Sequence, residues 1–289
     1  MKLVRFDAGS GPQSGVVADD ASGSPGVVGL AAAGCACTDI MDIINGGAAA
    51  LEAVARTVAK SKPQYALKDV RLLAPITRPG KYLAIGMNYK KHADEARRLG
   101  MAIPQHQVWF NKQTSCISGP FDEIDPGVSE KLDYEAELGL VIGTRAKGVS
   151  KEDALKYVFG YFVANDVSAR DWQQHTPTFT MGKSFDTHGP IGPWIITADE
   201  IADPQNLEMR CYVNDELRQE TNTSDMVHCI ASQINYLTTA FTLEPGDLIA
   251  TGTPSGVGIA MNPPVFLEPG DVVRCEIDGV GVIENRVGA

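Results

Sequence analysis

The sequence predicts an α+β, β-rich fold with a rolled or sandwiched β core. Short runs of β-branched and aromatic residues alternate with Pro-Gly turns, and few stretches have helical periodicity. The pentapeptide Leu-Glu-Pro-Gly-Asp occurs twice, at 243–247 and 267–271. Pro followed by Gly suits the two central positions of a type II turn, and each copy precedes a strand-like run, 248–250 and 272–277. Many short strands joined by such turns are typical of sandwiches and rolls.

Two domains are expected along the chain. Residues 1–75, rich in Gly, Ala, Ser and Asp, predict a small N-terminal α+β domain that packs on the main body and contains an amphipathic helix at 51–59. Residues 76–289 form the predicted catalytic domain, which begins with a strand at 81–86. Its best helix spans roughly 224–241, where apolar residues recur at spacings of three and four.

Composition limits the classes of partner. The 289 residues are 44% hydrophobic and 21% charged, and the formal net charge is -11. An excess of acidic residues makes nucleic acid or an anionic membrane surface an unfavourable partner. The sequence contains no apolar run near the roughly 20 residues of a membrane span. The six cysteines form no Cys-x-x-Cys pair and the N-terminus does not resemble a secretion signal, so we expect reduced thiols in a cytoplasmic protein.

Two glutamates separated by one residue are the most informative feature. Glu135 and Glu137 lie in an otherwise apolar run at 133–143. Side chains two apart on a strand point to the same face, and neighbouring carboxylates stay ionised only beside positive charge. A divalent cation would supply that charge. The alternative is an exposed edge strand with two solvated acids, which the apolar continuation of the run makes less favourable.

A third carboxylate, Asp166, follows about thirty residues later, inside another strand-like run at 161–167. A short helix with Ser150 as its N-cap is expected between the two strands. A strand–helix–strand arrangement can bring Asp166 beside the two glutamates. Three oxygen ligands without a nearby His or Cys suit a hard ion, Mg²⁺ or Mn²⁺, with Ca²⁺ as an alternative.

His92 and Glu95 are three residues apart, so on a helix they share a face. A carboxylate beside an imidazole orients it and raises its basicity, and the pair could act as a general base for water. The alternative is a solvated helix face with an incidental pair. The loosely patterned stretch at 100–104 could belong to a lid that carries the two side chains over a site.

Further polar positions are ambiguous by themselves. Lys183 lies in a Gly- and Ser-containing loop, and a surface lysine is the alternative interpretation. Gln173 is equally ambiguous. The Gly-rich segment 252–258 follows a strand but lacks a phosphate-loop pattern. The sequence assigns no role to His175, His188 or His228, which could be structural or could contact substrate.

Five segments occur in a set order: Gly-Met-Asn-Tyr-Lys-Lys-His-Ala-Asp-Glu, Asp-Tyr-Glu-Ala-Glu-Leu, Ala-Asn-Asp-Val-Ser-Ala-Arg-Asp-Trp-Gln, Gly-Lys-Ser-Phe-Asp-Thr and Thr-Gly-Thr-Pro-Ser-Gly-Val-Gly. Together, over about 78–287, they resemble the fumarylacetoacetate hydrolase family. The resemblance implies a mixed β-sandwich roll as the catalytic domain, and a homodimer. It also implies a role for each of eight residues. These are metal ligands (Glu135, Glu137, Asp166), a catalytic dyad on a lid (His92, Glu95), a catalytic lysine (Lys183) and substrate contacts (Gln173, Thr253).

The implied activity is a metal-dependent hydrolase that cleaves a C–C bond in 1,3-diketo acids. The substrates would be acylpyruvates such as fumarylpyruvate or maleylpyruvate from aromatic catabolism, and the products pyruvate and a carboxylic acid. The same site would also suit an oxaloacetate decarboxylase, or a hydrolase or isomerase of diketo sugar acids. A catalytically silent binding scaffold is the remaining alternative, and the presence of the dyad and all three carboxylates speaks against it.

Overall fold

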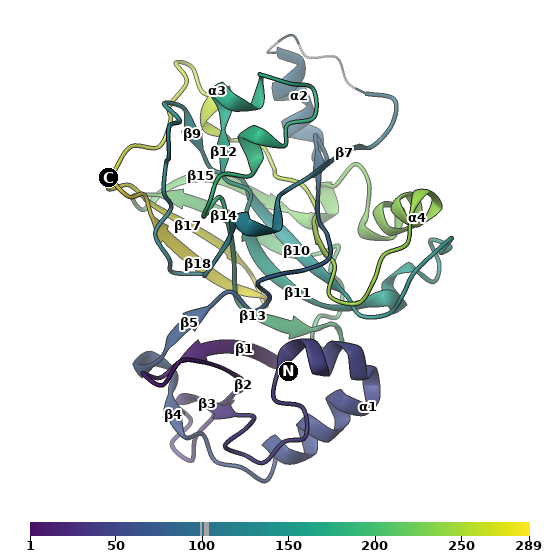
Figure 1. Ribbon diagram of the computed structural model, residues 1–289. Helices are drawn as coiled ribbons and strands as arrows, with labels where there is room; N and C mark the ends of the chain where they lie inside the picture. The colour runs from purple at the N-terminus through teal and green to yellow at the C-terminus, as the bar shows by residue number, and fades with distance from the viewer. Residues whose placement is uncertain (99, 101–103) are drawn as a thin grey trace.

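The computed structural model describes residues 1–98, 100 and 104–289. Within these residues a 12-stranded mixed sheet runs through the molecule (Figure 1). Its strands lie in the order β4 (Tyr65–Ala66), β3 (Pro25–Gly29), β2 (Pro12–Asp19), β1 (Lys2–Asp7), β13 (Gly189–Thr197), β11 (Val158–Asn165), β10 (Ala136–Ile142), β16 (Leu248–Ala250), β6 (Tyr82–Gly86) and β7 (Val108–Asn111). β5 (Arg71–Leu73) also pairs with β1, and β8 (Ile117–Ser118) with β13.

The N-terminal segment joins the main body through this sheet. β1 runs antiparallel to β13, with Lys2 opposite Ile196, so the lower lobe in Figure 1 continues the strands above it. The helix α1 (Ile40–Val58) begins at Asp39, whose side chain accepts a hydrogen bond from the Met41 amide. The predicted helix at 51–59 is its second half. The first half escaped prediction because Gly47, with φ 56°, interrupts the helical backbone. The predicted domain boundary at residue 75 stays a prediction.

A second sheet supplies the other layer of the sandwich. It is antiparallel, in the order β15 (Glu216–Asn222), β14 (Glu208–Val213), β17 (Val272–Ile277) and β18 (Gly281–Arg286). β14 and β17 alternate partly exposed and buried residues, and their buried residues share one core cluster with alternate residues of β10 and β11, among them Leu138, Leu140, Tyr161 and Val163. Period-two burial is what a sheet with one face on a core requires. The two-layer β core expected from the sequence is confirmed.

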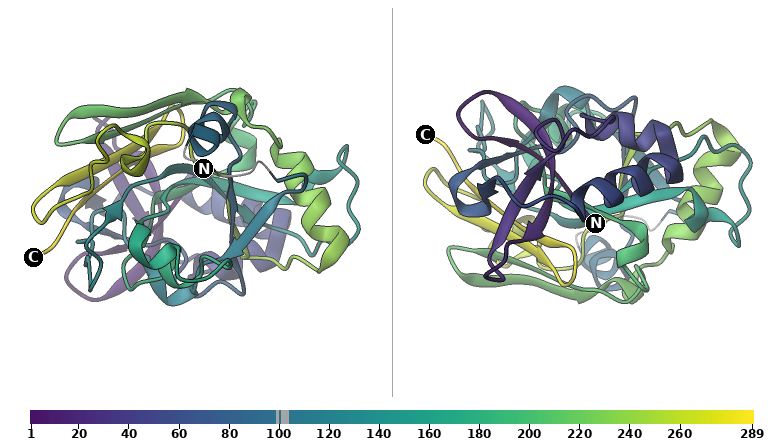
Figure 2. Two further views of the ribbon diagram at one scale, coloured as in Figure 1. Left: turned by 90° about the horizontal axis from the view of Figure 1, so that it is seen from above. Right: turned by 90° about the horizontal axis from the view of Figure 1, so that it is seen from below.

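The helices lie outside these layers. Figure 2 shows β17 and β18 at one side of the molecule and α4 (Ile230–Ala240) at the other. α4 is shorter than the predicted 224–241, because a 3₁₀ turn at Thr223–Asp225 precedes it. The helix expected after Ser150 is only a 3₁₀ turn at Ala154–Tyr157. The remaining 3₁₀ turns are η1 (Leu67–Asp69), η2 (Thr114–Cys116), η4 (Met181–Lys183), η5 (Ala198–Glu200) and η7 (Gly258–Ala260).

Short elements gather at one end of the β core, at the top of Figure 1. They are α2 (Lys90–Arg98), α3 (Arg170–Gln173) and the two-stranded ladder of β9 (Leu132–Asp133) and β12 (Ser168–Ala169). Loops and short elements above a rigid sheet are common carriers of functional residues. The predicted strands at 81–86, 248–250 and 272–277 are present as β6, β16 and β17.

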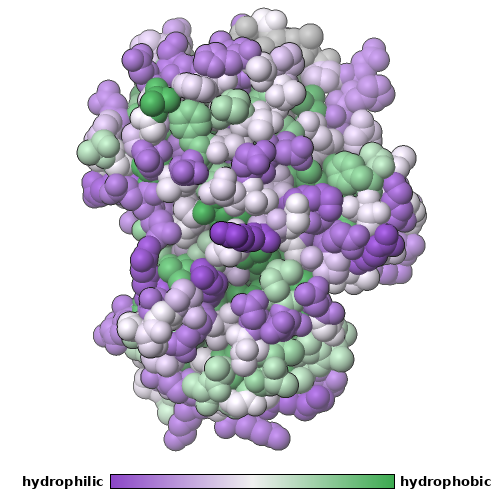
Figure 3. Space-filling model, in the orientation of Figure 1, coloured by the Kyte–Doolittle hydropathy of each residue, from purple (hydrophilic) through white to green (hydrophobic). Residues whose placement is uncertain are grey.

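The surface in Figure 3 carries mainly hydrophilic residues, with hydrophobic ones scattered among them. No helix among the described residues has the length and apolar character needed to cross a bilayer. The six cysteines are free thiols, four of them buried.

Candidate active site

Two neighbouring strands bring the three acidic residues together. Glu137 lies on β10, Glu135 directly precedes this strand, and Asp166 directly follows β11. The antiparallel pairing of β10 with β11 places Ala136 opposite Asn165, and the Asp166 amide donates to the Glu135 carbonyl at 2.9 Å. One carboxylate oxygen from each of Glu135, Glu137 and Asp166 lies within 4.8 Å of the others, and all three residues are buried.

Two buried lysines compensate part of this negative charge. The ammonium of Lys183 lies 2.8 Å from Glu135 Oε2 and 2.8 Å from Asp166 Oδ2. Lys112 lies 2.6 Å from Asp166 Oδ1 and also donates to the Lys183 carbonyl. Burial alone would lower the pKa of Lys112, but the negative charge of Asp166 outweighs it and raises the pKa. Lys112 therefore stays charged beside Asp166.

Arg170, at the start of α3, is the third cation that contacts the buried carboxylates. Its Nε donates to Asp133 Oδ2 at 2.8 Å, and its Nη2 lies 2.7 Å from Glu135 Oε1. Burial would raise the pKa of Glu135, but Lys183 and Arg170 outweigh it and hold the pKa at about 2. Glu135 is thus an anion fixed in place by two cations.

Glu137 is the acid that these cations leave uncompensated. One of its oxygens accepts the Gly252 amide at 2.8 Å, and no lysine or arginine among the described residues forms an ion pair with it. Burial, Asp166 and Glu135 raise the pKa of Glu137 well above its usual value. A buried carboxylate in this position is stabilised by an added positive charge. Three oxygen donors around one point therefore fit a divalent metal ion.

His92 and Glu95 form the predicted pair on α2. His92 Nδ1 lies 3.1 Å from Glu95 Oε2, and the other Glu95 oxygen accepts the Gly256 amide at 3.0 Å. The Glu95 carboxylate therefore has one oxygen fixed by the Gly256 amide and the other engaged with Nδ1 of His92. The second ring nitrogen of His92 remains available for a proton. Residues 101–103 of the predicted lid lie outside the described residues.

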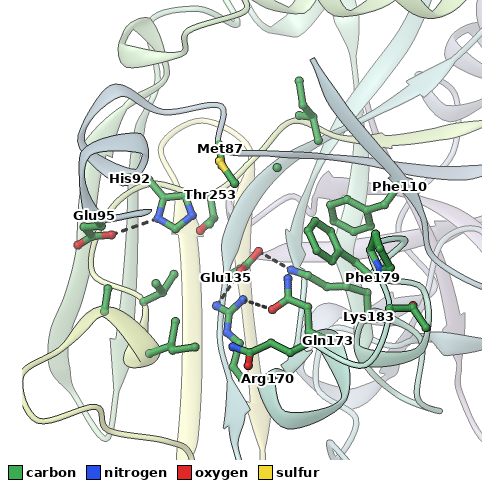
Figure 4. Close-up of a pocket in the computed structure, with 18 of the residues that line it drawn as sticks. Met87, His92, Glu95, Phe110, Glu135, Arg170, Gln173, Phe179, Lys183 and Thr253 are labelled. Carbon is green, nitrogen blue, oxygen red and sulfur yellow. Dashed lines mark hydrogen bonds and ion pairs between the residues drawn. The ribbon is translucent and has the colours of Figure 1, made fainter. Parts of the chain in front are cut away.

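A pocket of about 380 Å³ joins the dyad to the acidic cluster. In Figure 4, His92 and Glu95 lie on one side, Lys183, Phe110 and Phe179 lie on the other, and Glu135 lies between them. Gln173 and Thr253 also line this pocket. Gln173 Oε1 accepts from Arg170 at 3.0 Å, and Thr253 Oγ1 accepts from Gln219 at 2.9 Å. Both side chains are oriented by neighbours, as a group that positions a substrate would need to be.

Three residues at this site escaped sequence reasoning: Lys112, Asp133 and Arg170. Asp133 is fully buried and accepts the amides of Gly258 and Ile259 at 2.8 and 3.0 Å as well as the Arg170 guanidinium. It therefore ties the loop at 256–260 to the acidic cluster. A signal was present, because an Asp two residues before Glu135 and an Arg three residues before Gln173 lie within the quoted motifs.

The three histidines without an assigned role lie in different places. His175 lines the pocket and packs against Trp172, with ring centroids 5.0 Å apart. His188 is buried away from it, with Nε2 2.9 Å from the Asp125 carbonyl. His228 donates its backbone amide to Asn88 at 2.8 Å. The Gly-rich segment contributes the Gly252 and Gly256 amides to Glu137 and Glu95.

Curated relatives cover between 76% and 99% of the chain. A mitochondrial oxaloacetate tautomerase from Bos taurus is 42% identical over 293 residues, covering 99% of this chain and 91% of the relative. A human mitochondrial oxaloacetate tautomerase is 41% identical over 293 residues, with the same coverage of both chains. A fumarylacetoacetate hydrolase domain-containing protein from Dictyostelium discoideum is 46% identical over 233 residues, 76% of this chain and 75% of the relative.

Solved structures share the fold. A fumarylacetoacetate hydrolase from Exiguobacterium antarcticum is 35% identical, with a TM-score of 0.81, over 100% of this chain and 99% of its own. A maleylpyruvate hydrolase from a Sphingobium species, solved with manganese(II) and pyruvate, is 32% identical, with a TM-score of 0.80, over 100% of this chain and 99% of its own. This neighbour and the buried triad together indicate a divalent-metal site.

The predicted cytoplasmic location is wrong. The oxaloacetate tautomerases that match 99% of this chain are mitochondrial proteins. The prediction relied on reduced cysteines and on acidic charge. These properties are consistent with any reducing aqueous compartment. The compartment itself is determined by targeting signals that receptors recognise.

The family comparison agrees with the site and the fold. The family described as Fumarylacetoacetate (FAA) hydrolase C-terminal matches residues 81–288. That match contains the triad, the dyad, Lys183 and the pocket loops described above, and it covers more than half of the chain. The chain therefore belongs to the fumarylacetoacetate hydrolase family and has its β-rich α+β fold.

Proposed function

We propose that this enzyme is a divalent-metal-dependent hydrolase that cleaves the C–C bond of acylpyruvates. The observation that carries the proposal is the dyad of His92 and Glu95 facing Lys183 and Glu135 across one pocket (Figure 4). A base for water on one side and a cation beside a metal-type carboxylate cluster on the other suit hydrolysis of a substrate held between them.

Glu135, Glu137 and Asp166 would hold the ion, which we propose to be Mg²⁺ or Mn²⁺. When bound, the ion would neutralise and orient the carboxylate and adjacent keto oxygen of the pyruvoyl group. The neighbour solved with manganese(II) and pyruvate supports this assignment. Gln173 and Thr253, both at the pocket wall, would fix the rest of the substrate.

The protein side chains then carry the proton transfers. His92, held at Nδ1 by Glu95, takes a proton from water, and the resulting hydroxide attacks the acyl carbonyl. The C–C bond breaks and its electron pair passes to the pyruvate fragment as an enolate. The Lys183 ammonium stabilises this developing negative charge. His92 returns its proton to the enolate carbon, which releases pyruvate and a carboxylic acid.

Steady-state hydrolysis of acetylpyruvate tests the proposal. We expect pyruvate formation that depends on added Mg²⁺ or Mn²⁺ and stops on chelation, measured by coupling to lactate dehydrogenase. Pyruvate production no faster than in enzyme-free buffer with the same ion would exclude hydrolysis of this substrate class.

Oxaloacetate chemistry is the second candidate, and the oxaloacetate tautomerases 41–42% identical to the chain favour it. Keto–enol exchange and decarboxylation use the same 2-oxo acid end but need no attacking water. We predict that His92→Ala lowers acetylpyruvate hydrolysis by about 10²–10⁴-fold, the usual contribution of a general base. Oxaloacetate decarboxylation, followed as pyruvate release, should fall far less. Equal losses would show that His92 does not act on water specifically.

A further inference from the structure

Apolar side chains form a large part of the pocket wall. Its hydrophobic lining includes six residues: Met87, Phe110, Phe179, Val257, Ile259 and Ala260. Phe110 and Phe179 pack edge-to-face with centroids 5.9 Å apart, and the Lys183 ammonium lies 5.2 Å from the Phe110 centroid. This lining offers a large area for apolar contact, and its uncharged polar residues include Gln173, Gln174, Thr176 and Thr253.

The cations that line the pocket are already paired. Arg170 and Lys183 are the arginine and the lysine among the described lining residues. Arg170 contacts Asp133 and Glu135, and Lys183 contacts Glu135 and Asp166. Glu95 and Glu135 line the same pocket and add negative charge. A carboxylate at the far end of a substrate would therefore leave water without gaining an unpaired cation, which is costly.

The position of the dyad identifies which wall meets the acyl group. Water activated by His92 must reach the acyl carbonyl, so this carbonyl and its substituent lie on the His92 side of the pocket. Glu95 accepts the Gly256 amide at 3.0 Å, which joins the dyad to the loop at 256–260. Asp133 holds the same loop through the Gly258 and Ile259 amides. The side chains of Val257 and Ile259 consequently form a fixed apolar wall beside the reacting carbonyl.

We propose that the preferred acyl group is uncharged and apolar, and that Val257 and Ile259 select it. This inference rests on the proposed acylpyruvate site. It makes fumarylpyruvate and maleylpyruvate, whose acyl parts bear a carboxylate, poor substrates for this chain. Each methylene buried against such a wall favours binding, whereas an unpaired carboxylate opposes it.

A matched pair of substrates tests the inference. 4-Methylpentanoylpyruvate and succinylpyruvate have nearly the same shape and differ in whether two methyl groups or two carboxylate oxygens end the acyl chain. With Mg²⁺ present, we expect kcat/KM to be at least about tenfold higher for the methyl compound, as hydrophobic pockets discriminate on this scale. Equal values, or a preference for succinylpyruvate, would overturn the inference and leave acylpyruvate hydrolysis standing.

Calorimetric binding to His92→Ala separates failure of the inference from failure of the proposed function. If neither compound is hydrolysed by the unaltered enzyme but the variant binds the methyl compound at least tenfold more tightly, the apolar selection holds and the hydrolase proposal fails. Equal or reversed affinities in the variant contradict the selection, whatever the activity.

Substitutions in the loop test the named residues. Ile259→Ala should lower the ratio of kcat/KM for 4-methylpentanoylpyruvate to kcat/KM for acetylpyruvate about tenfold, because acetylpyruvate has only a methyl group to bury. Ile259→Lys should raise the relative use of succinylpyruvate. Val282→Ala is the matched control, because Val282 is 39% exposed on β18 and does not line the pocket. A uniform loss on all substrates for Ile259→Ala would show a structural role and contradict its assignment.

Discussion

Glu137 has the least compensated charge at the acidic cluster. It is buried, it accepts one backbone amide, and its neighbours Glu135 and Asp166 are engaged by cations that do not pair with it. Removing the charge with a side chain of the same shape should therefore relieve repulsion in the metal-free protein. The same change should remove a metal ligand.

We predict opposite effects of Glu137→Gln on metal affinity and on stability. The affinity for Mn²⁺, measured by calorimetry, should fall by 100-fold or more, because one of three anionic donors is lost. The metal-free variant should unfold at an equal or higher urea concentration than the unaltered protein. Glu52→Gln, at an exposed position on α1, is the control and should change neither quantity. Unchanged Mn²⁺ affinity would remove Glu137 from the metal site.

His188 is buried away from the pocket, and its titration should affect how the free energy of unfolding depends on pH. Burial, followed by the charge of Lys112, lowers the pKa of His188 to about 4. In the unfolded chain a histidine titrates near 6.5. Between these values the unfolded state binds more protons, so stability is lost as the pH falls from about 6.5 towards 4. The free-energy difference at stake is on the order of 3 kcal/mol.

We predict that His188→Gln reduces this acid loss. The amide keeps a donor for the Asp125 carbonyl but does not titrate. The measurement is the free energy of unfolding by urea at pH 7 and at pH 5, and the difference between the two should be smaller in the variant. His106→Gln, at an exposed position, should keep the pH dependence of the unaltered protein. The same pH dependence in both variants would contradict the role of His188.

At the scale of elements, β10 and β11 position the acidic cluster, and their contact depends on a glycine. Gly139 lies opposite Phe162, both inside the sheet. A Cβ atom at Gly139 would lie 2.2 to 2.6 Å from three atoms of the Phe162 ring. The ring fills the space that a side chain would need, so the close approach of the two strands requires glycine here.

We predict that Gly139→Ala destabilises the fold by roughly 1–3 kcal/mol, the usual cost of overpacking a core. Because Glu137 lies two residues away on the same strand, Mn²⁺ affinity should fall as well. Urea unfolding and calorimetry measure the two effects. Gly29→Ala on β3 is the control, since its nearest new contacts would be 3.6 and 3.7 Å away. Equal stability of the two variants would contradict the prediction, because it would show that β10 and β11 accommodate the added methyl group without loss of free energy.

At the scale of the whole molecule, one sheet connects the N-terminal segment to the strands that carry the site. β13 lies between β1 and β11, and Asp166 directly follows β11. A ligand that binds the folded cluster and not the unfolded chain stabilises everything that unfolds with it. The homodimer expected from the family stays a prediction, which light scattering of the purified protein would test.

We predict that saturating Mn²⁺ raises the thermal midpoint of the entire chain in one transition. At a free concentration 100 times the dissociation constant the added stability is about 2.7 kcal/mol. Calorimetry with Mn²⁺ and then with a chelator measures the shift, which should be absent in Glu137→Gln. Two separate transitions, of which only one responds to Mn²⁺, would show that the N-terminal segment unfolds independently.

Part of the fold was predictable because its signals are local. The apolar run after Glu137 predicts a buried strand, and the two Pro-Gly turns predict the strands that follow them. The glutamate pair predicts a shared face because side-chain period along a strand is two residues. The first half of α1 was not predictable by this means, since Gly46 and Gly47 weaken the local helical signal.

The sequence by itself determined the β-rich class, the identity of the clustered carboxylates and the spacing of the dyad. Only the tertiary structure decided that Lys112, Lys183 and Arg170 meet these carboxylates, and that Asp133 ties the 256–260 loop to them. Lys112 reaches Asp166 across 54 residues and Asp133 reaches Gly258 across 125. Contacts over such separations follow from the packing of the complete sheet, which no local periodicity encodes.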